Sequence, residues 1–254
     1  MKFFNRFIPF FAALSIFIIL EQSLRMPKQI YWLGSFCFLI VILSTWQLIG
    51  RKFFQRKFWQ NLITPILFLA SGLVFLSFLE SAWLKQFIIL ILAISIWLFL
   101  FVIFFRFNLR SKYQVHSLEN ISSHLNLLTI FFCSSGFYGL LIFLGFPLRF
   151  LVFGFGVVCF LLTIQLIWDS DTTLAKDYPY LIVITLIITE MFLVVSFLPT
   201  SVYVNGFIVT ISYYLIGGLS RNWLLGNKER KVVSRYLITS VITLIIILAT
   251  AKWF

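Results

Sequence analysis

The feature that most constrains this chain is a series of apolar stretches separated by short basic loops. A helix needs roughly 20 apolar residues to cross about 30 Å of hydrocarbon. In lipid, a helix also satisfies its own backbone hydrogen bonds. We therefore predict an all-α fold, a polytopic transmembrane helical bundle in which residues 1–254 form a single integral membrane domain. About nine spans are expected, at about 7–24, 30–50, 61–79, 87–105, 125–144, 148–168, 180–198, 203–220 and 236–253.

Composition excludes the soluble classes. The chain is 61% apolar and 11% charged, whereas soluble domains are about 45–50% apolar and about 25% charged. The first apolar stretch follows Lys2 and Arg6, as the apolar core of a signal peptide would. No small-residue cleavage site comes after it, so we expect an uncleaved membrane anchor.

The charge distribution predicts an orientation. The net charge is +12, and the basic residues lie mainly between the apolar stretches. With the N-terminus inside, 15 of the 20 Lys and Arg residues fall in inside segments and 5 fall outside. Cytoplasmic loops are the ones enriched in Lys and Arg, so we predict a cell-membrane protein with a cytoplasmic N-terminus and an external C-terminus. Its partners would be the lipid bilayer and, at the basic cytoplasmic loops, anionic lipid headgroups. We expect no nucleic-acid partner, since no basic face with interleaved aromatic residues is present.

An internal repeat is a further possibility. A shift of 119 residues aligns the first four stretches with the next four in the same orientation. It places Ser77-Phe78-Leu79 on Ser196-Phe197-Leu198, and Leu62-Ile63 on Leu181-Ile182. A parallel four-plus-four repeat with one extra helix would explain an odd number of spans. Chance matches between Leu- and Phe-rich strings are the competing explanation.

Glu190 is the residue whose place in the sequence most needs an explanation, because it falls near the middle of the seventh apolar stretch. An acidic residue at the centre of a membrane helix costs roughly 2.5–3.5 kcal/mol. A functional interpretation is a proton-, cation- or substrate-binding group that faces an internal cavity. The structural alternative is a protonated side chain that hydrogen-bonds a neighbouring helix. Both interpretations predict that Glu190 faces protein.

Depth in the membrane suggests which residues accompany Glu190. Tyr213 and Tyr214 fall mid-way along the eighth stretch, which would run antiparallel to the seventh after a short turn. We therefore predict a polar pocket at the midplane formed by Glu190, Tyr213 and Tyr214, as a substrate- or proton-binding site.

Metal and thiol chemistry receive weaker support. Asp169 and Asp171 form an Asp-x-Asp pair in a predicted cytoplasmic loop, and such carboxylates can hold Mg²⁺ together with a substrate phosphate. A solvated loop that caps the next helix would have the same sequence. Cys37, Cys133 and Cys159 all lie in apolar stretches without CxxC spacing, so we expect free buried thiols.

Three functions remain open at this point. The first is a small-solute transporter or permease with a midplane polar site at Glu190. The second is a non-catalytic membrane subunit or assembly factor with a membrane-protein partner. The third is a membrane-embedded transferase that acts on a lipid-linked substrate through Asp169 and Asp171, with Mg²⁺ as its cofactor. The first two need no cofactor, and the lack of any familiar catalytic motif favours a protein that is not an enzyme.

Overall fold

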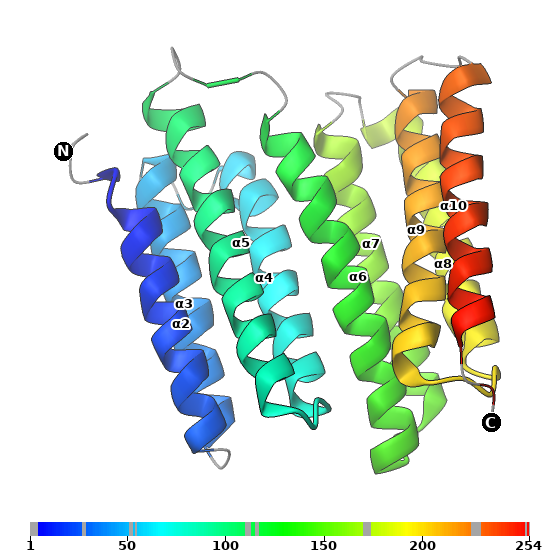
Figure 1. Ribbon diagram of the computed structural model, residues 1–254. Coiled ribbons are helices and arrows are strands. Elements are labelled where there is room, and N and C mark those ends of the chain that lie inside the picture. The colour runs from blue at the N-terminus through cyan, green and yellow to red at the C-terminus, as the bar shows by residue number, and fades with distance from the viewer. Residues whose placement is uncertain are drawn as a thin grey trace. The chain divides into compact units, whose positions relative to one another are not determined.

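The computed structural model describes residues 5–26, 29–50, 53, 55–109, 113–114, 117–169, 174–224, 230–251 and 253. These residues form nine helices and no strand (Figure 1), which confirms the predicted all-α class. The helices are α2 (Ile8–Arg25), α3 (Ile30–Ile49), α4 (Arg56–Ser77), α5 (Ala82–Asn108), α6 (Ser117–Leu144), α7 (Leu148–Asp169), α8 (Leu174–Val195), α9 (Val202–Leu224) and α10 (Arg230–Thr250).

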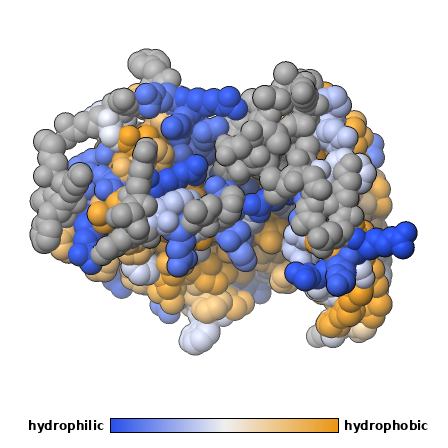
Figure 2. Space-filling view, turned by 90° about the horizontal axis from the view of Figure 1, so that it is seen from above, coloured by the Kyte–Doolittle hydropathy of each residue, from blue (hydrophilic) through white to orange (hydrophobic). Residues whose placement is uncertain are grey.

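The helices have the length and composition of membrane spans. Within the described residues, eight helices are long and apolar enough to cross a bilayer, and α8 contributes a shorter apolar segment, Pro179–Val195. Figure 2 shows hydrophilic residues on the helix ends that face the viewer and hydrophobic residues on the flanks below them. The chain is therefore built as a multi-pass membrane protein whose flanks contact lipid.

Several helices begin earlier than the sequence predicts. α4 begins at Arg56 rather than 61, and α6 begins at Ser117 rather than 125. The predicted bounds followed hydropathy, which marks the hydrocarbon region, whereas a helix continues into the polar boundary. In α4 the added turn contains exposed Arg56 and Lys57 beside fully buried Phe58. α8 differs at its other end, since it stops at Val195 rather than 198.

The chain divides into two compact units, Met1–Asn126 and Leu127–Phe254. Unit 1 contains α2 to α5 and the start of α6. Within it α2 packs against α3 and α5, and α3 packs against α4. Polar contacts supplement the apolar core: Thr64 on α4 donates a hydrogen bond to Asn126 on α6 (3.3 Å), and Asn108 at the end of α5 donates one to the Leu48 carbonyl (3.1 Å).

Unit 2 contains the rest of α6 and helices α7 to α10. Its core is a stack of three aromatic rings from three helices. Phe192 of α8 lies between Tyr138 of α6 and Phe155 of α7, with ring centroids 4.6 and 4.3 Å away. The Tyr138 hydroxyl also donates a hydrogen bond to the Phe192 carbonyl (2.7 Å). This stack sets the rotation of α8 about its own axis.

Small residues bring other helices of unit 2 together. Gly206 of α9 lies against Ser135 of α6, where a Cβ on the glycine would be 3.2 Å from the Ser135 backbone nitrogen. Ser134 donates a hydrogen bond to the Gly206 carbonyl at the same crossing (3.4 Å). Close approach at small residues is a common way for membrane helices to associate.

Three of the four helix starts compared agree with the 119-residue repeat. Shifted by that amount, α3 would cover 149–168, α4 would cover 175–196 and α5 would begin at 201. α7 covers Leu148–Asp169, α8 covers Leu174–Val195 and α9 begins at Val202. These three starts agree within one residue, but α2 would begin at 127, whereas α6 begins at Ser117. The duplication therefore stays a prediction. The single integral membrane domain stays a prediction.

Candidate binding groove between α7 and α8

Packing of α8 fixes the direction in which Glu190 points. The buried side chains of this helix are Leu181, Ile184, Ile188, Phe192 and Val195, which recur with the spacing of one helical face. Glu190 is two residues from both Ile188 and Phe192, and two residues turn a helix by about 200°. Glu190 therefore lies opposite the buried face, and its side chain is exposed. The prediction that Glu190 faces protein is wrong, because the packing of Phe192 turns the other side of α8 toward the core.

α7 and α8 run antiparallel, and one contact aligns their levels. A Cβ on Gly156 of α7 would be 3.4 Å from the Thr189 hydroxyl of α8. Gly156 lies in the first half of α7 and Thr189 lies in the second half of α8, as expected for an antiparallel pair. The glycine leaves space beside Thr189 that a larger side chain would fill.

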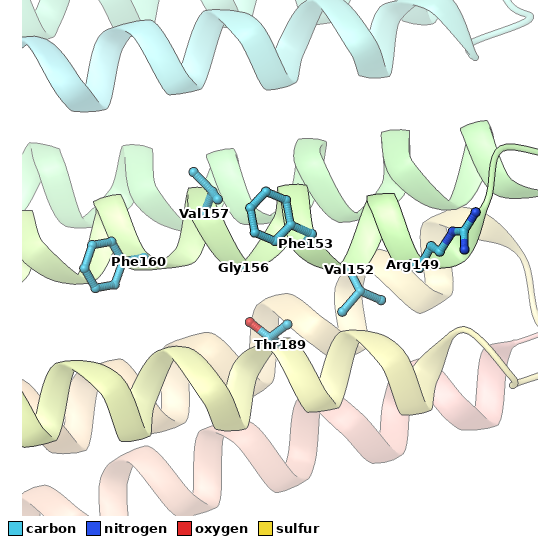
Figure 3. Close-up of a pocket in the computed structure, with 7 residues that line it drawn as sticks. All are labelled: Arg149, Val152, Phe153, Gly156, Val157, Phe160 and Thr189. Carbon is cyan, nitrogen blue, oxygen red and sulfur yellow. The ribbon is translucent and has the colours of Figure 1, made fainter.

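An open groove runs along this helix pair. Its first part, of about 450 Å³, is lined by Arg149, Val152, Phe153, Gly156, Val157, Phe160 and Thr189. Its second part, of about 340 Å³, is lined by Val152, Ile182, Thr185, Leu186, Thr189, Glu190 and Leu193. Because Val152 and Thr189 line both parts, we treat them as one feature and call it the α7–α8 groove. In Figure 3, Arg149 stands at one end of the row of α7 side chains and Phe160 at the other.

Few polar groups line the α7–α8 groove. The Thr189 hydroxyl donates a hydrogen bond to the Thr185 carbonyl (2.7 Å), and the buried Thr185 hydroxyl has no hydrogen-bond partner among the described residues. Arg149 is exposed, with its guanidinium 5.0 Å from the centre of the Phe150 ring. Within the described part of the chain, neither Glu190 nor Arg149 forms an ion pair.

The two charged side chains of the groove lie at different depths. Arg149 is seven residues from Gly156 toward the start of α7, and Glu190 is one residue from Thr189 toward the same end of the pair. At 1.5 Å per residue, their levels differ by about 9 Å along the helix axes. Glu190 is also about 7–8 Å from the end of α8. Residue 190 is therefore closer to the end of its helix than the predicted span of 180–198 implied.

The structure places the predicted pocket residues in three different surroundings. Tyr213 is buried, and its hydroxyl has no hydrogen-bond partner among the described residues. Tyr214 is partly buried and pairs with the ring of Tyr236 on α10 (5.0 Å). The Glu190 side chain lines the α7–α8 groove. No contact found in the described residues joins Glu190 to either tyrosine, so a shared binding role stays a prediction.

Most of the predicted metal site lies outside the residues that the structure describes. Asp171 and the side chain of Asp169 lie outside the described residues. Among the residues that are described, no group of three or more His, Cys, Asp and Glu side chains could hold a metal ion. Cys37, Cys133 and Cys159 are buried and form no disulfide bond, as the sequence predicts.

Sequence reasoning missed Arg149 and Gly156 as members of a site. Their spacing carries a usable signal, because Arg149, Val152, Gly156 and Phe160 follow the three- and four-residue steps of one helix face. A glycine in such a row, with a cation at its end, marks a candidate groove.

Comparisons with protein families, with curated proteins and with solved structures found no match to this chain.

Proposed function

We propose that this protein is a small-solute permease of the cell membrane, in which Glu190 binds a proton or the solute within the α7–α8 groove. One observation carries the proposal: an acidic side chain is exposed in an apolar groove, without an ion-pair partner among the described residues. Hydrocarbon tolerates a carboxyl group in its neutral form. Glu190 would then exchange a proton when water or a polar solute enters the groove. The predicted orientation, with a cytoplasmic N-terminus, belongs to the same proposal.

Proton movement provides a test that requires no known substrate. Purified protein would be reconstituted into vesicles that contain a pH-sensitive dye, and a potassium diffusion potential would drive protons inward. We expect faster acidification than in protein-free vesicles, and we expect Glu190→Gln to remove the difference. Glu80→Gln is the matched control, because Glu80 is exposed in the connection between α4 and α5. Equal rates in wild-type and protein-free vesicles would contradict proton coupling.

Carbodiimide chemistry tests the surroundings of Glu190 separately. Dicyclohexylcarbodiimide dissolves in membranes and reacts with protonated carboxyl groups, whereas a water-soluble carbodiimide reaches groups in water. We expect the first reagent to modify Glu190 and the second to modify Glu80, as read by peptide mass spectrometry. Modification of Glu190 by the water-soluble reagent alone would argue against an apolar groove.

A non-catalytic membrane subunit is the second candidate. It is favoured by α10, of which only 6% is buried, and by the open side of the α7–α8 groove. Both surfaces leave room for helices of a partner protein. In native membranes such a partner would shield Glu190 from dicyclohexylcarbodiimide, and purification would restore the reaction. The transferase with Mg²⁺ at Asp169 and Asp171 remains a proposal without a described geometry.

A further inference from the structure

The α7–α8 groove has the length of one membrane leaflet. From Arg149 to Phe160, its α7 wall extends over twelve residues, which corresponds to about 16 Å at a rise of 1.5 Å per residue. The hydrocarbon core of a bilayer is about 30 Å thick, so each leaflet contributes about half of that. A single extended acyl chain therefore matches the groove in length.

The wall of the groove has the chemistry of an acyl-chain site. Val152, Phe153, Val157 and Phe160 are apolar, and Phe153 is 74% exposed. Gly156 leaves a depression between them at the level of Thr189. A volume of about 450 Å³ is within the range of roughly 300–1,000 Å³ that is usual for small-molecule sites.

Arg149 supplies the complementary charge at the end of the groove. It is the second residue of α7, exposed, and outside any ion pair among the described residues. A guanidinium presents a fork of N–H donors that fits two oxygens of one phosphate. A cation at the mouth of an apolar groove selects a molecule that is anionic at one end and apolar along the rest.

We propose that the α7–α8 groove binds one acidic phospholipid, with the phosphate on Arg149 and one acyl chain along Val152, Gly156 and Phe160. Glu190 lies about 9 Å below Arg149 along the helix axes, so its side chain adjoins the upper part of the acyl chain. The site lies on unit 2 alone. It does not depend on solute transport, and the vesicle assay above tests transport independently.

Native mass spectrometry of the purified protein tests the site. The protein would be titrated with equal amounts of phosphatidylglycerol and phosphatidylcholine, and bound lipid would be counted. We expect wild-type protein to retain phosphatidylglycerol selectively. Arg149→Gln should weaken this retention about tenfold, which corresponds to about 1.4 kcal/mol. Arg25→Gln is the matched control, because Arg25 is also an exposed arginine at a helix end, and it should leave retention unchanged.

A second variant tests the acyl chain. Val157 is 44% exposed on the groove wall, so Val157→Trp should fold, as a circular dichroism spectrum would show, while its indole occupies the groove. We expect it to lower retention of phosphatidylglycerol as strongly as Arg149→Gln. Unchanged retention in Val157→Trp, equal loss in Arg25→Gln, or no selectivity in wild-type protein would each overturn the proposal. Displacement of the lipid by soluble glycerol phosphate at equal concentration would also overturn it, because a free phosphate ester would then be the ligand.

Discussion

Two glycines of unit 2 should respond differently to substitution by alanine. At Gly206 an added Cβ would be 3.1 Å from the Ser135 Cβ and 3.2 Å from the Ser135 backbone nitrogen, and it would overlap the Ser135 hydroxyl. Backbone atoms cannot move aside without separating α6 from α9. Overpacking of this kind costs about 1–3 kcal/mol, so we expect Gly206→Ala to lower the free energy of unfolding by about 2 kcal/mol.

Gly156 is the matched control for Gly206. A Cβ there would be 3.4 and 3.5 Å from Thr189 side-chain atoms, which is ordinary contact. Alanine is a better helix former than glycine by up to about 1 kcal/mol. Gly156→Ala should therefore leave unfolding unchanged or raise its free energy slightly.

Reversible unfolding by dodecyl sulfate in mixed micelles, followed by far-ultraviolet circular dichroism, would measure both effects. Adding Ser135→Gly to Gly206→Ala should recover part of the loss, since it removes the overlapping hydroxyl and Cβ but leaves the backbone nitrogen in place. Contacting residues commonly show coupling of about 0.5–3 kcal/mol. Equal stability of the Gly206→Ala and Gly156→Ala proteins would refute the proposed close crossing of α6 and α9.

Two further outcomes follow from the packing. Tyr138→Phe removes the hydrogen bond to the Phe192 carbonyl but keeps the ring stack, so it should cost about 0.6 kcal/mol and at most about 1.7 in the same unfolding assay; no change would show that the bond contributes nothing. Cys37, Cys133 and Cys159 are 0–2% exposed, so a maleimide should leave the folded protein unlabelled and should label all three thiols after denaturation. Labelling of any of them before denaturation would contradict the packing of its helix.

The number and approximate position of the helices can be predicted from hydropathy, because the bilayer imposes length and composition on each span. Hydropathy does not predict the direction in which a side chain points from such a helix. α8 carries apolar residues on all its sides, so its sequence does not distinguish the face of Phe192 from the face of Glu190. That distinction arises from the ring stack with Tyr138 and Phe155, which joins residues far apart in the chain.

The depth of a residue in the membrane and the rotation of its helix about the helix axis are independent of each other. This explains why the three predicted pocket residues lie in different surroundings. The sequence places Glu190, Tyr213 and Tyr214 at similar depths, but it gives no information on rotation about the helix axes. In the structure Tyr213 is buried and the ring of Tyr214 packs on the ring of Tyr236, while the Glu190 side chain lines the groove. The groove itself depends on the contact of Gly156 with Thr189, which only the packing of α7 on α8 creates.

The exposure of residue 190 to lipid is the central claim, and a nitroxide at that position measures it directly. Glu190→Cys, in a protein without its three native cysteines, would be spin-labelled in a bilayer. Collision rates would then be measured with oxygen, which concentrates in hydrocarbon, and with a water-soluble nickel complex. We predict frequent collisions with oxygen and few with nickel, and few with either reagent at the buried control Ile188→Cys. Few collisions with both reagents at position 190, or frequent collisions with nickel, would contradict the account.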